Sequence, residues 1–284
     1  MKKFLALLLT GVLTLGLVGC GGGEEAEAPA EGDAAEAVTL KIGASPTPHA
    51  DILKAAQEEL AAEGINLEIV EFTDYVQPNL TLDAGDLDAN FFQHKPYMEQ
   101  FNQEHGTDLV SIGAVHYEPM GIYAGTESDL ANVPDGAKIG IPNDSTNGGR
   151  ALFLLQENGL IKLDPEAGIF ATKLDIVENP KNIEIVDMEA AQLPLALDDL
   201  AFAVINGNYA LQNGLKVADA LTIESADSLA ASTYANIIAV KAGTEDRPEF
   251  QKLMEVLKGK VVEEYINSTY EGAVAMAVEA EEAE

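Results

Sequence analysis

The sequence predicts an α/β fold with mostly parallel sheets, divided into two lobes. Short β-branched runs alternate with helical patterns along most of the chain, which is typical of strand–helix–strand units. The pattern also restarts, because "LKIGASP" at 40–46 is echoed by "AKIGIPN" at 137–143. With 284 residues, 47 % of them hydrophobic, the chain is long enough to fill two modest cores.

The first half of the predicted fold rests on periodic patterns between residues 39 and 124. Glycine at position 64 marks the end of the first helix, because glycine is favoured just beyond a helix C-terminus. We expect this half, residues 38–125, to form the first part of lobe one. Its predicted strands are 39–43, 66–72, 89–92, 109–115 and 120–124, and its predicted helices are 49–62, 75–84 and 96–104.

The second half begins with a strand at 137–143 that runs into an apolar helix. We expect residues 126–232 to form lobe two, with further strands at 183–186 and 201–205 and helices at 190–197 and 209–213. An apolar strand at 235–240 then leads into helices at 248–257 and 261–268. These last elements are expected to bring residues 233–284 back to lobe one, ending in an acidic tail.

The N-terminal segment "MKKFLALLLTGVLTLGLVGC" has the architecture of a secretory signal peptide. Lys2 and Lys3 precede an uncharged apolar run that is too short to span a bilayer comfortably. Its end, "LVGC", resembles the lipobox of bacterial lipoproteins, in which the cysteine is acylated. We therefore expect a signal peptide at 1–19, lipidation of Cys20, and a flexible acidic linker over 20–37. An ordinary signal peptide or a short membrane anchor is the alternative.

Composition excludes several classes of function. Lys and Arg number 16 against 48 Asp and Glu, a net charge of −32, so a nucleic-acid partner is not expected. Cys20 is the only cysteine, which excludes disulfides and a cysteine nucleophile. The four histidines, at 49, 94, 105 and 116, lack metal-ligand spacing, and no hydrolase or phosphate-binding motif is present. We expect no metal, no cofactor and no catalysis.

One arginine stands in an unusual place. Arg150 lies in the first turn of an apolar helix, where the helix dipole favours acidic side chains. Capping residues at 143–147 precede it, and Gly148 and Gly149 allow a ligand to approach the backbone closely. Exposed N–H groups beside a guanidinium suit a carboxylate ligand. A surface salt bridge with one of the many acids is the alternative explanation.

Two other clusters contain side chains suited to a small amphipathic ligand. Aromatic residues in "FTDYVQPN" and "DANFFQHKPYM" lie near the end of a predicted strand, where open α/β sheets usually bind ligands. Amides in "AVINGNYA" and "TYANIIAV" lie at strand ends and could bind both charges of a zwitterion. Core packing, turns and helix caps would use the same residue types. The candidates are Tyr75, Phe92, His94, Tyr97, Asn206 and Asn236.

Several of these stretches, in this order, resemble the NlpA family of methionine-binding lipoproteins, the solute receptors of methionine ABC importers. The resemblance covers about 40–275 and implies a two-lobed periplasmic-binding-protein fold, type II-like, with a ligand cleft between the lobes. It rests on "DYVQPN", "DANFFQHKPYM", "HYEPMGIYA", "IPNDSTNGGRALFLLQENGLI", "VENPKNIEIVDMEAAQLPLALDD", "AVINGNYALQNGL" and "YANIIAV".

The resemblance implies a role for each candidate. Arg150 would pair with the methionine carboxylate, and Asn147, Asn206 and Asn236 would hydrogen-bond the polar head of the amino acid. The thioether chain would be enclosed by Tyr75, Phe92, His94 and Tyr97.

The implied function is that of a receptor rather than an enzyme. It would be lipid-anchored on the extracytoplasmic face of the cell membrane, bind L- or D-methionine, and deliver it to a permease served by a separate ATPase. The alternatives are another apolar amino acid, a methionine derivative or a methionyl peptide as ligand. Two further alternatives, from other functional classes, are a surface enzyme and an adhesion lipoprotein.

Overall fold

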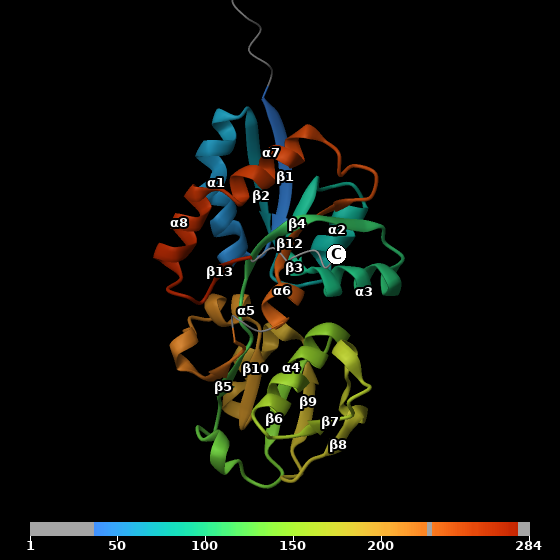
Figure 1. Cartoon of the computed structure of the whole chain (residues 1–284), viewed down its shortest axis with the longest axis vertical. Helices are drawn as coiled ribbons and strands as arrows, with labels where there is room; N and C mark the ends of the chain where they lie inside the picture. Colours follow the sequence, from blue (N-terminus) through green and yellow to red (C-terminus); the bar gives the residue numbers. More distant parts are fainter. Residues whose placement is uncertain (1–36, 226–228, 278–284) are drawn as a thin grey trace, which may run out of the picture. The chain divides into compact units, whose positions relative to one another are not determined.

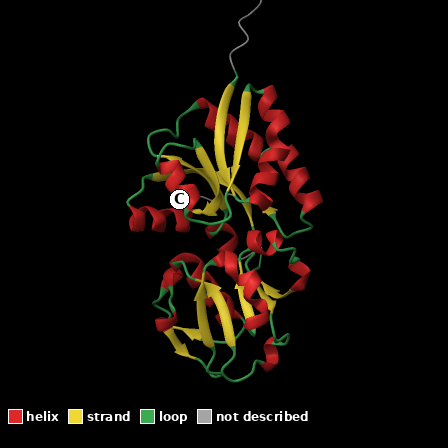
Figure 2. Cartoon of the chain, turned by 180° about the vertical axis from the view of Figure 1, so that it is seen from behind, coloured by secondary structure: helices red, strands yellow, loops and turns green. Residues whose placement is uncertain are grey.

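The structure, a computed structural model, describes residues 37–225 and 229–277. The predicted signal peptide, Cys20 and nearly all of the predicted linker lie outside these residues. The α/β class is confirmed: two sheets carry helices packed against them (Figures 1 and 2). We call the part built around the six-stranded sheet the first lobe and the part built around the five-stranded sheet the second lobe.

The sheet of the first lobe is mixed, with strand order β13-β4-β12-β3-β1-β2. β1 pairs in parallel with β2 and β3, whereas β12 lies antiparallel between β3 and β4. Its strands are β1 (Val38–Ala44), β2 (Ile65–Glu71), β3 (Ala89–His94), β4 (Leu109–Tyr117), β12 (Asn236–Lys241) and β13 (Ala275–Met276).

Both faces of this sheet are covered by helices. Along β12, Ile238 and Val240 belong to one hydrophobic cluster and Ile237 and Ala239 to another, because successive strand residues point to opposite faces. The first cluster includes residues of α1 (Asp51–Ala62), α7 (Pro248–Leu257) and α8 (Lys260–Thr269), and the second includes residues of α2 (Gln77–Asp83) and α3 (Lys95–His105).

The sheet of the second lobe has strand order β11-β5-β10-β6-β9. β10, β6 and β9 are parallel, and β5 runs antiparallel to its neighbours. The lobe consists of β5 (Gly121–Ala124), β6 (Lys138–Pro142), α4 (Ser145–Glu157), β7 (Lys162–Leu163), β8 (Ile176–Glu178), β9 (Glu184–Met188), β10 (Phe202–Ile205), α5 (Gly207–Gln212) and β11 (Ala220–Ile223), with α6 (Leu229–Thr233) leading back to β12.

One expected lobe assignment is wrong. The sequence pattern predicts residues 120–124 in the first lobe, but β5 pairs with β10 and β11 in the second sheet. The chain therefore crosses between the sheets at residues 118–120, not after residue 125 (Figure 1). Pro119 lies in this crossing, and proline cannot donate a ladder hydrogen bond that would continue β4.

Two predicted helices also differ in detail. α2 begins at Gln77 rather than at residue 75, because Asp74 Oδ1 accepts hydrogen bonds from the backbone N–H groups of Val76 and Gln77. This turn leaves Tyr75 outside the helix. The helix expected at 190–197 is a 3-10 helix over Ala190–Asp199, and it contains Pro194, which lacks the N–H needed by a regular α-helix.

The strand ends of the two lobes bring the candidate residues together. In the first lobe, Asn236 at the start of β12 pairs in register with His94 of β3 and His116 of β4. In the second lobe, the residues after β6 and β10 lead into α4 and α5. Carboxyl ends of parallel strands are the usual ligand sites of open α/β sheets, and here both sheets offer such an edge.

The core packing makes one prediction about stability. Leu53 in α1 is fully buried, so Leu53→Ala should lower the free energy of unfolding by about 2–5 kcal/mol. The matched control is Leu174→Ala, because Leu174 is 91 % exposed and its loss should change stability by less than about 0.5 kcal/mol. Urea denaturation followed by circular dichroism measures both, and equal effects would contradict the assigned core.

Candidate functional site

A narrow pocket lies where the strand ends of the two lobes meet. Its lining includes all eight residues singled out as ligand-binding candidates, so the structure brings the three sequence clusters to one place. First-lobe and second-lobe residues both contribute. The lining consists of Tyr75, Phe92, Gln93, His94, Tyr97, Glu118, Asn147, Arg150, Asn206, Gly207, Asn208 and Asn236.

Three aromatic rings form one wall of the pocket. The ring centroids of Tyr75, Phe92 and Tyr97 lie 5.8–6.0 Å apart. The Tyr97 hydroxyl donates to the backbone oxygen of Tyr75 at 2.9 Å, and the Tyr75 hydroxyl donates to Oδ1 of Asn208 at 2.5 Å. The rings are thereby fixed in orientation, and this wall reaches from the first lobe to the second.

His94 is a neutral hydrogen-bond donor at the edge of this wall. Its Nδ1 accepts from the backbone N–H of Tyr97 and caps α3, so Nε2 carries the proton. Nε2 lies 3.2 Å from Oδ1 of Asn147, which also accepts from Nδ2 of Asn206 at 2.8 Å. Burial, together with the charge of Arg150, lowers the pKa of His94 to about 3. Asn147 therefore links His94 of the first lobe to Asn206 of the second.

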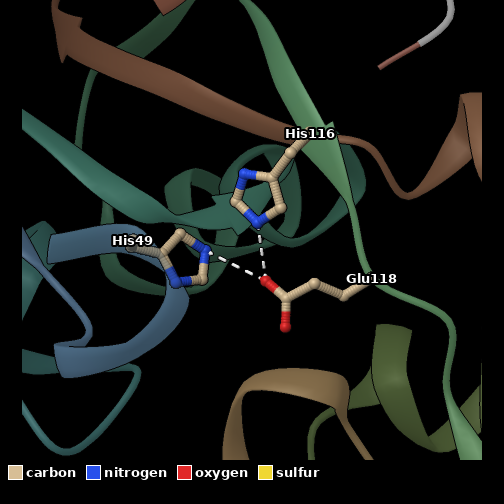
Figure 3. A group of neighbouring side chains, drawn as sticks. All are labelled: His49, His116 and Glu118. Carbon is tan, nitrogen blue, oxygen red and sulfur yellow. Dashed lines mark hydrogen bonds and ion pairs between the residues drawn. The ribbon is translucent and has the colours of Figure 1, made fainter. Parts of the chain in front are cut away.

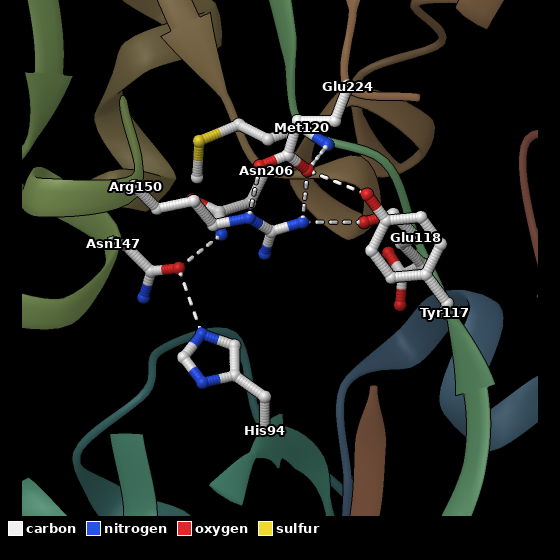
Figure 4. Close-up of polar contacts among 8 residues, drawn as sticks. All are labelled: His94, Tyr117, Glu118, Met120, Asn147, Arg150, Asn206 and Glu224. Carbon is white, nitrogen blue, oxygen red and sulfur yellow. Dashed lines mark hydrogen bonds and ion pairs between the residues drawn. The ribbon is translucent and has the colours of Figure 1, made fainter. Parts of the chain in front are cut away.

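Arg150 forms a buried ion pair with Glu224 (Figure 4). Nε lies 2.8 Å from Oε1 of Glu224 and Nη2 lies 2.5 Å from Oε2, while Nη2 also donates to the backbone oxygen of Glu118 at 3.0 Å. The Tyr117 hydroxyl and the backbone N–H of Met120 donate to the same carboxylate. Burial opposes ionisation, but Arg150 and these donors hold the pKa of Glu224 below its ordinary value.

The sequence did not reveal this partner. The alternative considered for Arg150 was a surface salt bridge, whereas the arginine is 4 % exposed and its pair is enclosed. Nε and Nη2 of Arg150 are thus both engaged by the carboxylate of Glu224. Among the described residues, Nη1 has no hydrogen-bond partner, and Figure 4 shows it directed away from Glu224. Nη1 is the part of the guanidinium that remains for a ligand.

Among residues 37–225 and 229–277, two amide atoms of the pocket lining are buried without a hydrogen-bond partner. Oδ1 of Asn206 is an unpaired acceptor and Nδ2 of Asn208 is an unpaired donor. Buried polar groups are normally hydrogen-bonded, so unpaired ones facing a pocket indicate a polar ligand. The pocket therefore offers donors from Arg150 and Asn208 and an acceptor from Asn206.

Glu118 supplies a second acceptor and lies on the crossing between the lobes. Its side chain lies close to Gly207 at the start of α5, where an added Cβ would lie 2.7 Å from the Cβ and 2.9 Å from Oε2 of Glu118. Burial raises the pKa of Glu118 to about 7, although His49, Arg150 and the backbone N–H of Asn208 act in the opposite direction. Arg150 is already neutralised by Glu224, so an ionised Glu118 gives the pocket a net negative charge.

Three buried groups could in principle hold a metal ion: His49, His116 and Glu118, whose ligand atoms lie within 4.8 Å of one another (Figure 3). The surroundings fit a metal poorly. Within the described part of the chain, Nδ1 of both histidines lacks a hydrogen-bond partner, whereas metal-bound histidines usually donate that N–H to an acceptor. Both Nε2 atoms instead face Oε1 of Glu118, at 2.7 and 3.4 Å. We interpret the cluster as a hydrogen-bonding network.

Sequence reasoning missed several residues of this site. Glu118 was present in the motif "HYEPMGIYA" but received no role, and Asn208 followed the candidate Asn206 without being chosen. Glu224, in "TIESADS", carries no local signal, because only the fold brings it to Arg150 across 74 residues. His49 and His116 are far apart in the sequence, and only the tertiary fold places their rings side by side.

Comparison with known proteins supports the resemblance. The family model described as NlpA lipoprotein matches residues 40–278. The chain belongs to the NlpA lipoprotein family. The D-methionine-binding lipoprotein MetQ of Salmonella typhimurium is 39 % identical over 276 residues, which cover 95 % of this chain and 97 % of MetQ.

Solved structures of relatives have the same two-lobed fold as this NlpA lipoprotein. Lipoprotein Tp32 from Treponema pallidum is 44 % identical, with a TM-score of 0.80, covering 85 % of this chain and 100 % of Tp32. A nutrient binding protein from Burkholderia cenocepacia, solved bound to methionine, is 42 % identical, with a TM-score of 0.80, covering 84 % of this chain and 100 % of that protein.

Family membership also concerns how the protein is associated with the membrane. The relatives are named lipoproteins, which agrees with a lipid-anchored, membrane-associated NlpA lipoprotein. Within residues 37–225 and 229–277, no helix is long and apolar enough to cross a bilayer. Attachment through Cys20 stays a prediction, because that residue lies outside the described part of the chain.

The buried ion pair yields a second prediction. Glu224→Gln should lower the free energy of unfolding by about 3 kcal/mol, because it leaves the charge of Arg150 buried without its partner. Glu178→Gln is the matched control, since Glu178 pairs with Lys162 at the surface and should contribute less than about 1 kcal/mol. Chemical denaturation measures both. Similar losses of unfolding free energy in the two variants would show that burial does not make the Arg150–Glu224 pair more costly to break.

A third prediction concerns Glu118 and pH. Its pKa is raised from 4.5 to about 7 in the folded protein, so between these values the native state binds more protons than the unfolded state. This carboxyl group therefore lowers stability as pH rises through that window. Glu118→Gln, which mimics the protonated form, should be more stable than the unmodified protein at pH 8 by about 1–3 kcal/mol, with the difference vanishing near pH 4.5.

Thermal unfolding from pH 4.5 to 8.5 in the absence of ligand checks this prediction. Glu189→Gln serves as the control, since Glu189 lies at the surface. A difference between Glu118→Gln and the unmodified protein that is constant with pH would show that Glu118 titrates normally.

Proposed function

We propose that the protein is a lipid-anchored receptor on the extracytoplasmic face of the cell membrane that binds methionine and delivers it to the permease of an ABC importer. Acylated Cys20 would supply the anchor, and the linker over 20–37 would separate it from the binding lobes. The permease and its ATPase would be separate proteins. The chain would bind and release its ligand without catalysis.

The observation that carries this proposal is the arrangement of unpaired polar atoms in the pocket. Donors from Nη1 of Arg150 and Nδ2 of Asn208 suit a carboxylate, while Oδ1 of Asn206 and the carboxylate of Glu118 suit an ammonium group. An α-amino acid carries both groups on one carbon. The zwitterion would therefore satisfy the groups that the pocket leaves unpaired.

The aromatic wall suits the side chain of methionine. Tyr75, Phe92 and Tyr97 line the pocket beside the polar groups, and thioethers make favourable contacts with aromatic rings. His94 would complete this wall and Asn236 would join the polar side, while Asn147 would act through its links to His94 and Asn206. A methionine-bound relative and a relative named for D-methionine binding support this choice of ligand.

The receptor role is favoured over an enzyme by the state of His94, Arg150 and Glu224. His94 is held neutral by burial, and both of its nitrogens are engaged in hydrogen bonds. Arg150 and Glu224 neutralise each other. Such groups are arranged for binding a zwitterion rather than for transferring protons.

Ligand analogues test the proposal without disturbing the fold. After unfolding and refolding to remove any bound ligand, L- or D-methionine at a hundred times its Kd should stabilise the protein by about 2.7 kcal/mol in a thermal-shift assay. Methionine amide, which keeps the ammonium but lacks the carboxylate, should bind about a hundredfold more weakly by calorimetry. Alanine, which lacks the thioether chain, is the control for the aromatic wall.

Two results would count against this function. Binding of the amide as tight as that of methionine would show that the pocket does not recognise a carboxylate. If no amino acid of either chirality raised the unfolding temperature, methionine would be excluded as the ligand.

A further inference from the structure

Two buried histidines lie beside Glu118, which belongs to the pocket lining, and point toward its carboxylate (Figure 3). His49 comes from the turn Pro46–Ala50 before α1, and His116 lies at the end of β4. They are 1 % and 0 % exposed and are not part of the pocket lining. Nothing in the proposed binding of methionine uses either ring directly.

Both rings hydrogen-bond residues that do line the pocket. Nε2 of His116 lies 2.7 Å from Oε1 of Glu118. Nε2 of His49 lies 2.9 Å from Oδ1 of Asn236 and 3.4 Å from Oε1 of Glu118. Each histidine therefore reaches the pocket through one intermediate side chain.

The rings are held in place by packing against Phe91. His49, His116 and Phe91 form three mutual edge-to-face contacts, with centroid distances of 4.8–5.1 Å. Phe91 is fully buried in β3, next to Phe92 of the aromatic wall. The ring planes, and hence the directions of the two Nε2 atoms, are set by the core of the first lobe.

The protonation of the rings follows from their partners. Nδ1 of both histidines has no hydrogen-bond partner among the residues that the structure describes, and both Nε2 atoms face oxygens. The proton therefore lies on Nε2, and both rings are donors. Burial lowers the pKa of His49 to about 4 and that of His116 to about 3, so both rings stay neutral between pH 5.5 and 8.5.

We propose that His49 and His116 are positioning residues that set the donor and acceptor pattern of the pocket. His116 holds the Glu118 carboxylate as an acceptor for the ligand's ammonium group. His49 donates its Nε2 hydrogen to Oδ1 of Asn236. Asn236 can then offer only its Nδ2 hydrogens, which suit the ligand's carboxylate. This inference rests on the proposed function and extends it to residues that do not touch the ligand.

Glu118 provides the readout for this role. The titratable and charged groups that face it are His49 and His116, Arg150 of α4, and Tyr75 of the aromatic wall. Hydrogen bonds from neutral donors favour the ionised carboxylate, so losing one of them raises the pKa of Glu118. Because the histidines do not titrate near neutral pH, a change of ligand affinity with pH in that range reports on Glu118.

The experiment is calorimetric titration of methionine from pH 5.5 to 8.5. Affinity of the unmodified protein should rise with pH through about 7 as Glu118 ionises. His116→Phe, which keeps a ring but removes the donor, should weaken binding at pH 7 at least about tenfold and move the midpoint up by about one pH unit. His116→Gln, whose amide can donate in place of Nε2, should restore the midpoint.

Methionine amide separates the two histidines. His116→Phe should weaken binding of methionine and its amide by the same factor, because both carry the ammonium group. His49→Phe should weaken methionine more than the amide, because Asn236 would lose its orientation toward the carboxylate. His105→Phe is the matched control, since His105 is exposed and stacks on Phe101 away from Glu118.

The outcomes distinguish this inference from the proposed function. If the unmodified protein binds no amino acid, the proposed function fails and the positioning role falls with it. If it binds methionine but His116→Phe leaves the affinity and midpoint unchanged, only the positioning role is overturned. Equal losses in His116→Phe and His116→Gln would likewise overturn it, by showing that the ring merely packs. If His116→Phe does not fold, His116→Gln must still keep the midpoint of the unmodified protein, and a midpoint raised by about one pH unit in this variant would overturn the role of His116.

Discussion

The ion pair between Arg150 and Glu224 determines how the rest of the site is built. A guanidinium that is 4 % exposed cannot remain in the protein without a partner, and Glu224 provides one from the end of β11. The same carboxylate accepts from Tyr117 at the end of β4 and from Met120 in the crossing between the lobes. One pair of charges thus joins α4, β11 and the crossing segment, and the pocket is arranged around the face of Arg150 that this pair leaves unused.

This arrangement explains why the pocket suits a zwitterion rather than a simple anion. If Arg150 were unpaired, its positive charge would offset the negative charge of Glu118, and a simple carboxylate would meet no net repulsion. With Glu224 in place, the remaining ionisable group is Glu118, which disfavours a ligand that lacks a positive charge. A carboxylate alone would then gain hydrogen bonds but meet repulsion from Glu118.

The strand and helix pattern was predictable because it depends on local periodicity. Runs such as 39–43 and 201–205 are short, β-branched and bounded by turn residues, and both form strands. The strand at 121–124 was found, but its sheet was not, because sheet membership depends on long-range pairing. All eight candidate residues lie around one pocket because the clusters fall at strand ends. The charge balance of that pocket could not be predicted, since Glu224 and the histidines behind Glu118 reach the site only through the tertiary fold.

The position of Glu118 has a consequence for how ligand preference can change in this protein. Glu118 lies on the crossing between the sheets, its backbone oxygen binds Arg150, and its side chain leaves no space for a Cβ at Gly207. A substitution there alters the joint between the lobes together with the recognition of charge. Phe92 and Tyr97 carry no such double duty, because both belong to the first lobe alone. New side-chain preferences can therefore arise at these two positions, by mutation or by design, while recognition of the ligand's ammonium and carboxylate groups stays unchanged.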